Sequence, residues 1–99
     1  MNEQYSKEEV LDMFMANIRL VTRHWSMQKG LTDKERCEGL ASSILTTIDG
    51  RSGGFPCALD LVARPHPDDK QFAIDNDDKY IEDGTVINDC LLNKLFAGN

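Results

Sequence analysis

SKEEVLDMFMANIRLVTRHWSMQ (residues 6–28) and TDKERCEGLASSILTTI (residues 32–48) are the stretches that decide the fold of this 99-residue chain. Each opens with a capping box, in which a hydroxyl residue and a glutamate three residues later each satisfy an exposed amide of the first helical turn. Apolar residues then recur at helical spacing, and a glycine follows each stretch. We therefore predict amphipathic helices over about residues 7–28 and 33–48.

Two faces of these predicted helices lie outside the main apolar stripes. In the first helix, Met13, Leu20 and Met27 recur every seven residues, which favours either a broad core contact or a dimer or partner face. The second helix carries small residues where charge is usual, namely Gly39, Ser43, Thr46 and Thr47. Such a face can pack closely on the first helix, pack on a second subunit, or be solvated.

The periodicity changes after the second helix. Residues 57–63 alternate between apolar and other side chains, which predicts a half-buried strand. Residues 71–74 and 79–82 predict two short strands of a hairpin around a turn at Asp75–Asp78.

A last helix is predicted from Asn88, which can cap its start, to Gly98, which can end it. The predicted fold class is therefore α+β. Two N-terminal helices pack on a small antiparallel sheet of about three strands, with a short C-terminal helix. We expect one domain over residues 1–99, which is enough chain for a single core.

Negative charge is concentrated in the second half of the chain. The formal net charge is −6, yet residues 1–36 carry six Lys/Arg and six Asp/Glu. Residues 68–89 carry eight carboxylates against Lys70 and Lys79. Such a field repels nucleic acid and anionic lipid and attracts basic surfaces. We predict a protein partner with a basic surface, bound by the acidic hairpin residues Asp75, Asp77, Asp78, Glu82 and Asp83.

The chain shows no targeting signal and few options for a cofactor. Its N-terminus lacks the basic and apolar regions of a signal peptide, and no apolar run has the roughly 18 residues of a membrane span. Three widely spaced cysteines argue for a reducing compartment. We therefore expect a cytoplasmic protein without a cofactor and without a nucleic-acid or membrane partner.

Three motifs resemble functional sites by their letters, but their context argues against them. Residues 50–54, GRSGG, match Gly-x-Ser-x-Gly but follow a helix rather than a strand. A calcium loop starting at Asp75 would have Tyr80 where glycine is needed. The cysteines and histidines lack the paired spacing of a zinc site. We predict no metal site and no catalytic residue from these motifs.

One further set of polar residues has chemical potential: Arg51, His66, Asp68 and Asp69. A histidine beside carboxylates can act as a general base, and an arginine in a glycine-rich loop can hold an anion. The alternative is structural, with the prolines at 65 and 67 ending one strand and the aspartates organising the next turn.

Residues 35–72, read as ERCEGLASSILTTIDG followed by RPHPDDKQF, resemble a pattern in small uncharacterised proteins of bacteriophage and prophage genomes. The resemblance implies an accessory protein of a bacterial or phage-infected cell. Our leading hypothesis is a non-enzymatic protein-interaction module with an acidic binding surface. The alternatives are a structural homodimer and a small enzyme that uses His66 and nearby acids.

Overall fold

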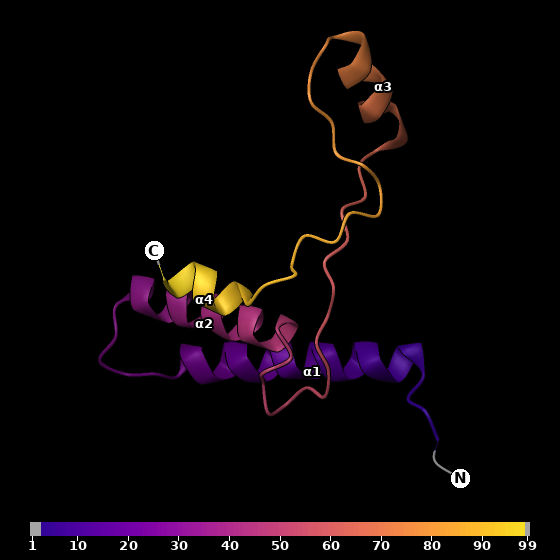
Figure 1. The fold of residues 1–99 in the computed structure, drawn as a ribbon. Coiled ribbons are helices and arrows are strands. Elements are labelled where there is room, and N and C mark those ends of the chain that lie inside the picture. Colours follow the sequence, from indigo (N-terminus) through magenta and orange to yellow (C-terminus); the bar gives the residue numbers. More distant parts are fainter. Residues whose placement is uncertain (1–2, 99) are drawn as a thin grey trace. The chain divides into compact units, whose positions relative to one another are not determined.

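The computed structural model describes residues 3–98 and divides the chain into two compact units. Unit 1 comprises Met1–Leu59 and Leu91–Asn99, and unit 2 comprises Asp60–Cys90. The elements in chain order are α1 (Lys7–Ser26), α2 (Asp33–Ile48), α3 (Pro67–Asp75) and α4 (Leu92–Ala97). Helices α1, α2 and α4 belong to unit 1, and α3 belongs to unit 2 (Figure 1). The number of independently folding domains stays a prediction.

Both predicted capping boxes form. The Ser6 hydroxyl accepts from the Glu9 amide while the Glu9 carboxylate accepts from the Ser6 amide, and Thr32 and Glu35 repeat the pattern at α2. These bonds satisfy amides that a helix start leaves without intrahelical partners. Helix α2 has the predicted bounds, whereas α1 ends two residues earlier than predicted, before Gly30 with its positive φ.

The small-residue face of α2 packs on α1. The Asn17 side chain donates to the Thr47 hydroxyl at 2.6 Å, and the Trp25 indole donates to the Ser43 hydroxyl at 2.8 Å. The Trp25 ring also lies against the backbone of Gly39, where an added Cβ would stand only 2.6 Å from ring atoms. For Gly39, Ser43 and Thr47 the structure shows the first of the three alternatives, because small residues permit close packing on α1. Thr46, the fourth residue of the predicted face, contacts Asn93 of α4 instead.

Helix α4 packs on α2 through a second set of polar contacts (Figure 1). The Asp49 carboxylate accepts from the Leu92 and Asn93 amides at 2.8 and 2.9 Å. Asp49 is also the C-cap of α2, so one residue ends one helix and supplies acceptors to the start of another. The Asn93 amide group donates to the Ser42 and Thr46 hydroxyls. α4 therefore begins where α2 ends.

Unit 1 buries few apolar side chains. Among residues 3–98 the buried hydrophobic residues are Phe55, which is 3% exposed, and Ala73 of unit 2. Phe55 follows the loop after α2 and meets Phe14 of α1 edge to face, with 5.6 Å between ring centroids. The polar residues Asn17 and Thr47 are buried as well. The helices are therefore held by hydrogen bonds between side chains as much as by an apolar core.

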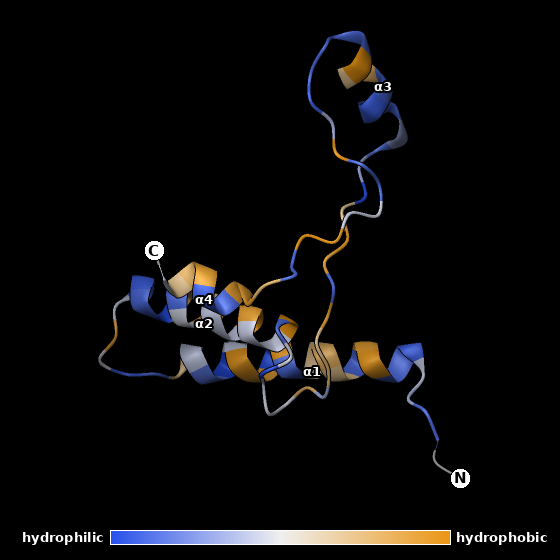
Figure 2. Ribbon diagram, in the orientation of Figure 1, coloured by the Kyte–Doolittle hydropathy of each residue, from blue (hydrophilic) through white to orange (hydrophobic). Residues whose placement is uncertain are grey.

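Unit 2 contains α3 and two segments, residues 61–63 and 84–88, that are joined by backbone hydrogen bonds and by the bond from the Leu61 amide to the Asn88 side chain. His66 is the N-cap of α3 and Pro67 is its first residue, where the missing amide of proline costs no hydrogen bond. An isolated antiparallel bridge joins Val62 to Val86. In Figure 2 the first half of α3 is hydrophilic and its second half holds the hydrophobic residues.

The predicted α+β fold, with its antiparallel sheet of about three strands, is wrong. Within the described residues the structure is helical and the Val62–Val86 bridge is its β pairing. Residues 71–74, predicted as a hairpin strand, belong to α3, because the signals at His66, Pro67 and Asp68 start a helix and outweigh a four-residue alternation. Residues 57–63 form no strand of a sheet: Leu61 and Ala63 share backbone hydrogen bonds with residues 84–87, but the β pairing is limited to the single Val62–Val86 bridge.

Candidate functional site

The predicted acidic residues lie together in unit 2, but on no hairpin. Asp75 is the last residue of α3, and Asp77 has a positive φ of 54° just after it. The Asp78 amide donates to the Ala73 carbonyl, so the stretch 75–78 ends a helix instead of joining two strands. All five residues of the predicted set are exposed. The acidic hairpin is corrected to an acidic helix end with a following loop.

One carboxylate of this set is neutralised within unit 2. The Lys70 ammonium donates to the Glu82 carboxylate at 2.8 Å and lies 5.0 Å from the centre of the Tyr80 ring. The hydrogen bond to Glu82 is the main cause that raises the pKa of Lys70 above its ordinary value. Asp75 accepts from the Gln71 side chain, a neutral donor. No salt bridge is found for Asp75 or Asp77 within the described chain.

His66 caps the start of α3. Its Nδ1 accepts from the Asp68 amide at 3.3 Å, and its carbonyl accepts from the Asp69 amide at 3.0 Å. Asp68 and Asp69 stand in the first turn, where carboxylates complement the positive end of the helix dipole. These residues therefore start a helix instead of ending a strand and organising a turn, and the histidine nitrogen that faces Asp68 is engaged in the cap.

Arg51 is in a different unit from the rest of the predicted polar set. It follows the end of α2 in unit 1, where its amide donates to the Thr46 carbonyl. His66, Asp68 and Asp69 lie in unit 2. Neither unit therefore contains all four residues of the predicted polar set. The enzyme hypothesis for His66 stays a prediction.

The predicted dimer residues lie on the side of α1 that α2 leaves uncovered. Leu20 is 61% exposed and Met27 is 63% exposed, whereas Met13 is half-buried. A broad core contact for this stripe is therefore wrong for Leu20 and Met27 within unit 1. The partner-face alternative stays a prediction.

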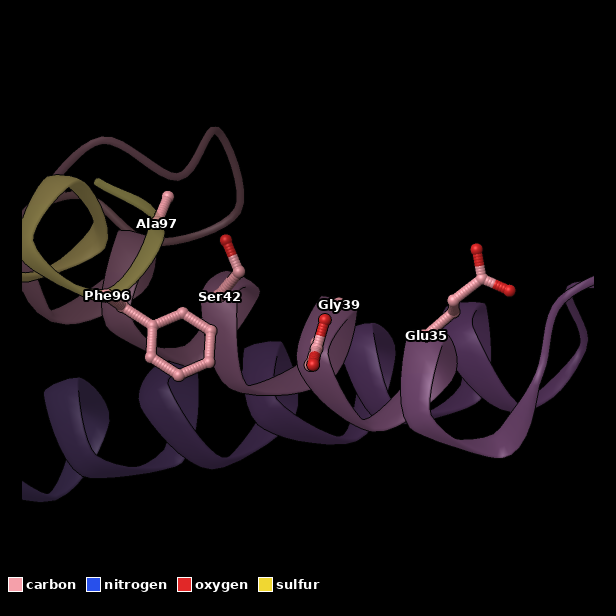
Figure 3. Close-up of a pocket in the computed structure, with 6 residues that line it drawn as sticks. Glu35, Gly39, Ser42, Phe96 and Ala97 are labelled. Carbon is pink, nitrogen blue, oxygen red and sulfur yellow. The ribbon is translucent and has the colours of Figure 1, made fainter. Parts of the chain in front are cut away.

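Two of the hollows in unit 1 are lined mainly by residues of α2 and of α1, respectively. One, with a volume of about 560 Å³, lies where α4 stops short along α2, and Figure 3 shows Phe96 and Ala97 beside the row Glu35, Gly39 and Ser42. The backbone amide of Thr32 donates to the Glu35 carboxylate and thereby lowers its pKa below the ordinary value. The carboxylate is thus engaged in the capping box. The other hollow, about 380 Å³, is lined by Lys7, Val10, Leu11, Phe14, Phe55 and Leu59.

Sequence reasoning missed the residues that join distant segments. Asn17 sits among apolar residues of α1 and carries no local signal for its bond to Thr47, thirty residues away. Asp49 and Asn93 are equally remote from each other in sequence. Phe55 could have been found, because a large aromatic residue in a glycine-rich loop commonly anchors that loop to a core.

Two features of residues 3–98 concern metal binding and membrane insertion. Nowhere in residues 3–98 do three His, Cys, Asp or Glu side chains converge as ligands for a metal ion. Over the same range, no helix has both the length and the apolar content that crossing a bilayer would require. All three cysteines are free and exposed.

Comparison with known proteins gives no relative from which residue roles could be transferred. No protein-family model matches the chain, and neither does any curated protein or any solved structure. The function is therefore argued from the charges, exposures and contacts described above.

Proposed function

We propose that this protein is a non-enzymatic interaction module and that unit 2 binds a protein with a basic surface. The observation that carries the proposal is the division of charge. Unit 2 holds nine Asp/Glu and three Lys/Arg, a net −6, whereas the rest of the chain holds eight of each. A field concentrated on 31 residues steers a basic partner toward this unit.

Exposed apolar side chains stand among these charges. Phe72 is 69% exposed and Ile81 is 60% exposed, and both lie close in sequence to the acidic residues. Charges mainly set the association rate, while aromatic and aliphatic anchors mainly set how slowly a complex dissociates. A surface with both kinds of residue suits a partner that is basic and partly apolar.

The proposed setting is the cytoplasm of a bacterial or phage-infected cell, where the protein acts as an accessory factor. Three free, exposed thiols suit a reducing compartment, because exposed cysteines form disulfides in an oxidising one. The resemblance of residues 35–72 to phage and prophage proteins supports the same setting.

The test combines capture with kinetics. Immobilised protein and the variant Asp75→Asn/Asp77→Asn/Asp78→Asn are exposed to bacterial lysate, and a protein retained only by the original chain is purified. Its association rate should fall steeply as the salt concentration rises, because salt screens the field that steers the partner. The rate should also be lower for the triple variant, because the substitutions remove part of that field. Phe72→Ala should act mainly on the dissociation rate.

A matched control removes three carboxylates from unit 1 by Glu3→Gln/Glu8→Gln/Glu38→Gln. This variant has the same net charge as the triple unit 2 variant and should bind like the original chain. Equal binding by all three proteins, or an association rate that does not respond to salt, would overturn the proposal.

A further inference from the structure

We infer that the uncovered side of α1 is a self-complementary surface on which a second copy of this chain docks antiparallel. Residues seven apart lie nearly in line on a helix, so this side carries three parallel rows. One row is charged (Asp12, Arg19), one is central (Glu9, Ala16, Arg23) and one is apolar (Met13, Leu20, Met27). We call these eight residues the free face of α1. All are exposed except Met13, which is half-buried.

Three charges of the free face have no ion-pair partner within the described chain. No salt bridge is found for Asp12, Arg19 or Arg23. Asp12 and Arg19 are about 10 Å apart along the helix axis, too far for a direct ion pair in one chain. Like charges even stand four residues apart, Glu8 with Asp12 and Arg19 with Arg23, an arrangement that destabilises an isolated helix.

The helix dipole explains only part of this pattern. Glu8 and Glu9 lie in the first turn of α1 and Arg23 lies in the last, where each complements the helix end. Asp12 and Arg19 lie further inside the helix, and the dipole effect fades within the terminal turns. Their positions therefore point to a partner outside the helix.

A two-fold axis through Ala16 gives every row a matching partner. In an antiparallel pair, a residue before Ala16 faces, to within one position, the residue of the same row that lies equally far after Ala16 on the second copy. Asp12 then faces Arg19 along one edge, and Met13 faces Leu20 along the other. In the central row Glu9 faces Arg23, and the small Ala16 lets the two helices approach closely. Because the two-fold symmetry forms each pair twice, the same surface on the two copies supplies both partners of every pair.

The net charge of the units favours a second copy as the occupant. Unit 1 is neutral overall, so two copies of it do not repel through net charge. A basic protein, the partner proposed for unit 2, would meet Arg19 and Arg23 on the free face. The inference is thus independent of the proposed function, and either can fail alone.

The test uses charge reversal at paired positions. Asp12→Arg and Arg19→Glu, each alone, should weaken the dimer about tenfold or more, because each turns two attractive pairs into two repulsive ones. Mixing the two single variants should restore the dimer as a heterodimer, since the residues at positions 12 and 19 then again face each other with opposite charge in both pairs. Sedimentation equilibrium at high micromolar concentration measures the masses, and circular dichroism checks that both variants keep their helices.

The matched control is the exposed Lys34–Glu38 pair of α2, with Glu38→Arg and Lys34→Glu as single variants. They make the same charge changes outside the free face and should leave the dimer unchanged. A monomer mass for the original chain, dimers for both single variants, or no recovery on mixing would each overturn the inference. Recovery on mixing also rules out a simple folding defect.

Discussion

Unit 1 and unit 2 differ in what holds them together. In unit 1, side chains bond groups thirty or more residues away in sequence, as Asn17 does with the Thr47 hydroxyl and Asp49 with the backbone amides that start α4. In unit 2, the side-chain bonds between remote residues include the exposed Lys70–Glu82 pair and the bond from the Leu61 amide to Asn88, and exposed ion pairs add little stability. Unit 1 is neutral and unit 2 carries the whole net charge. The comparison indicates that unit 1 is specified by its contacts, whereas unit 2 leaves most of its charges and several large apolar side chains exposed.

The largest expected effect comes from replacing one phenylalanine by alanine in each unit and comparing the loss of stability. Phe55→Ala should lower the free energy of unfolding by about 3–5 kcal/mol, because Phe55 is buried against Phe14 and a cavity remains. Phe72→Ala, the matched change in unit 2, should stay within about 0.5 kcal/mol. Urea denaturation at one protein concentration measures both. Equal losses would show that unit 2 has a core of its own.

A smaller effect is expected at the contact between α1 and α2. Gly39→Ala should cost about 1–3 kcal/mol, because its methyl group would overlap the Trp25 ring, although alanine favours a helix more than glycine does. Gly53→Ala is the control, since a Cβ there has open space. Thermal unfolding followed by circular dichroism measures both changes. A stabilising Gly39→Ala would mean that the two helices are not in close contact.

The remote cap of α4 should give an effect of about 0.5–2 kcal/mol, the usual cost of removing a helix cap. Asp49→Ala removes the acceptors for the Leu92 and Asn93 amides, so these amides should exchange hydrogen faster. Asp83→Ala removes an exposed carboxylate of unit 2 and should leave α4 unchanged. Native-state hydrogen exchange reads the result directly. Unchanged protection of the Leu92 and Asn93 amides after Asp49→Ala would show that this carboxylate does not stabilise the start of α4.

The smallest effect is expected for Asp75→Asn/Asp77→Asn/Asp78→Asn, within about 0.5 kcal/mol. Asparagine keeps the acceptor for Gln71 and tolerates the positive φ at position 77, while crowded negative charge is relieved. The melting temperature measures the change, with and without calcium. Unfolding of the variant, or strong stabilisation of the original chain by calcium, would give these carboxylates a structural or metal role.

Helices α1 and α2 were predictable because their signals are local, whereas the predicted cap of the last helix at Asn88 is wrong, since α4 begins at Leu92 and Asn88 accepts from the Leu61 amide. Ser6 with Glu9 and Thr32 with Glu35 mark helix starts within four residues, and the structure forms both capping boxes. The contacts that place α4 were not predictable, since no pattern within a few residues links Asp49 to Asn93. The sequence did not show whether the small-residue face of α2 packs on α1, on a second subunit or against solvent. The contact of the Trp25 ring with Gly39 shows that it packs on α1.

Unit 2 was misread because a short alternation fits several structures. Phe72 and Ile74 stand two residues apart, as on one side of a strand, but two apolar residues at that spacing also occur in a short helix. His66 and Pro67 were interpreted as ending a strand, whereas they start α3. The exposure of the predicted acidic residues needed no fold to predict, because unpaired carboxylates rarely lie in a core.

Two sets of hydrogen bonds hold the chain on either side of residues 60–90. The Leu59 amide donates to the Ile48 carbonyl, and the Leu92 and Asn93 amides donate to Asp49. The chain is tied to two consecutive residues of unit 1, once just before residues 60–90 begin and once just after they end. Residues 60–90 therefore form a cassette inserted at a single point of a helical frame. We expect that a short flexible linker can replace such an insert and that the helical frame can carry another segment in its place.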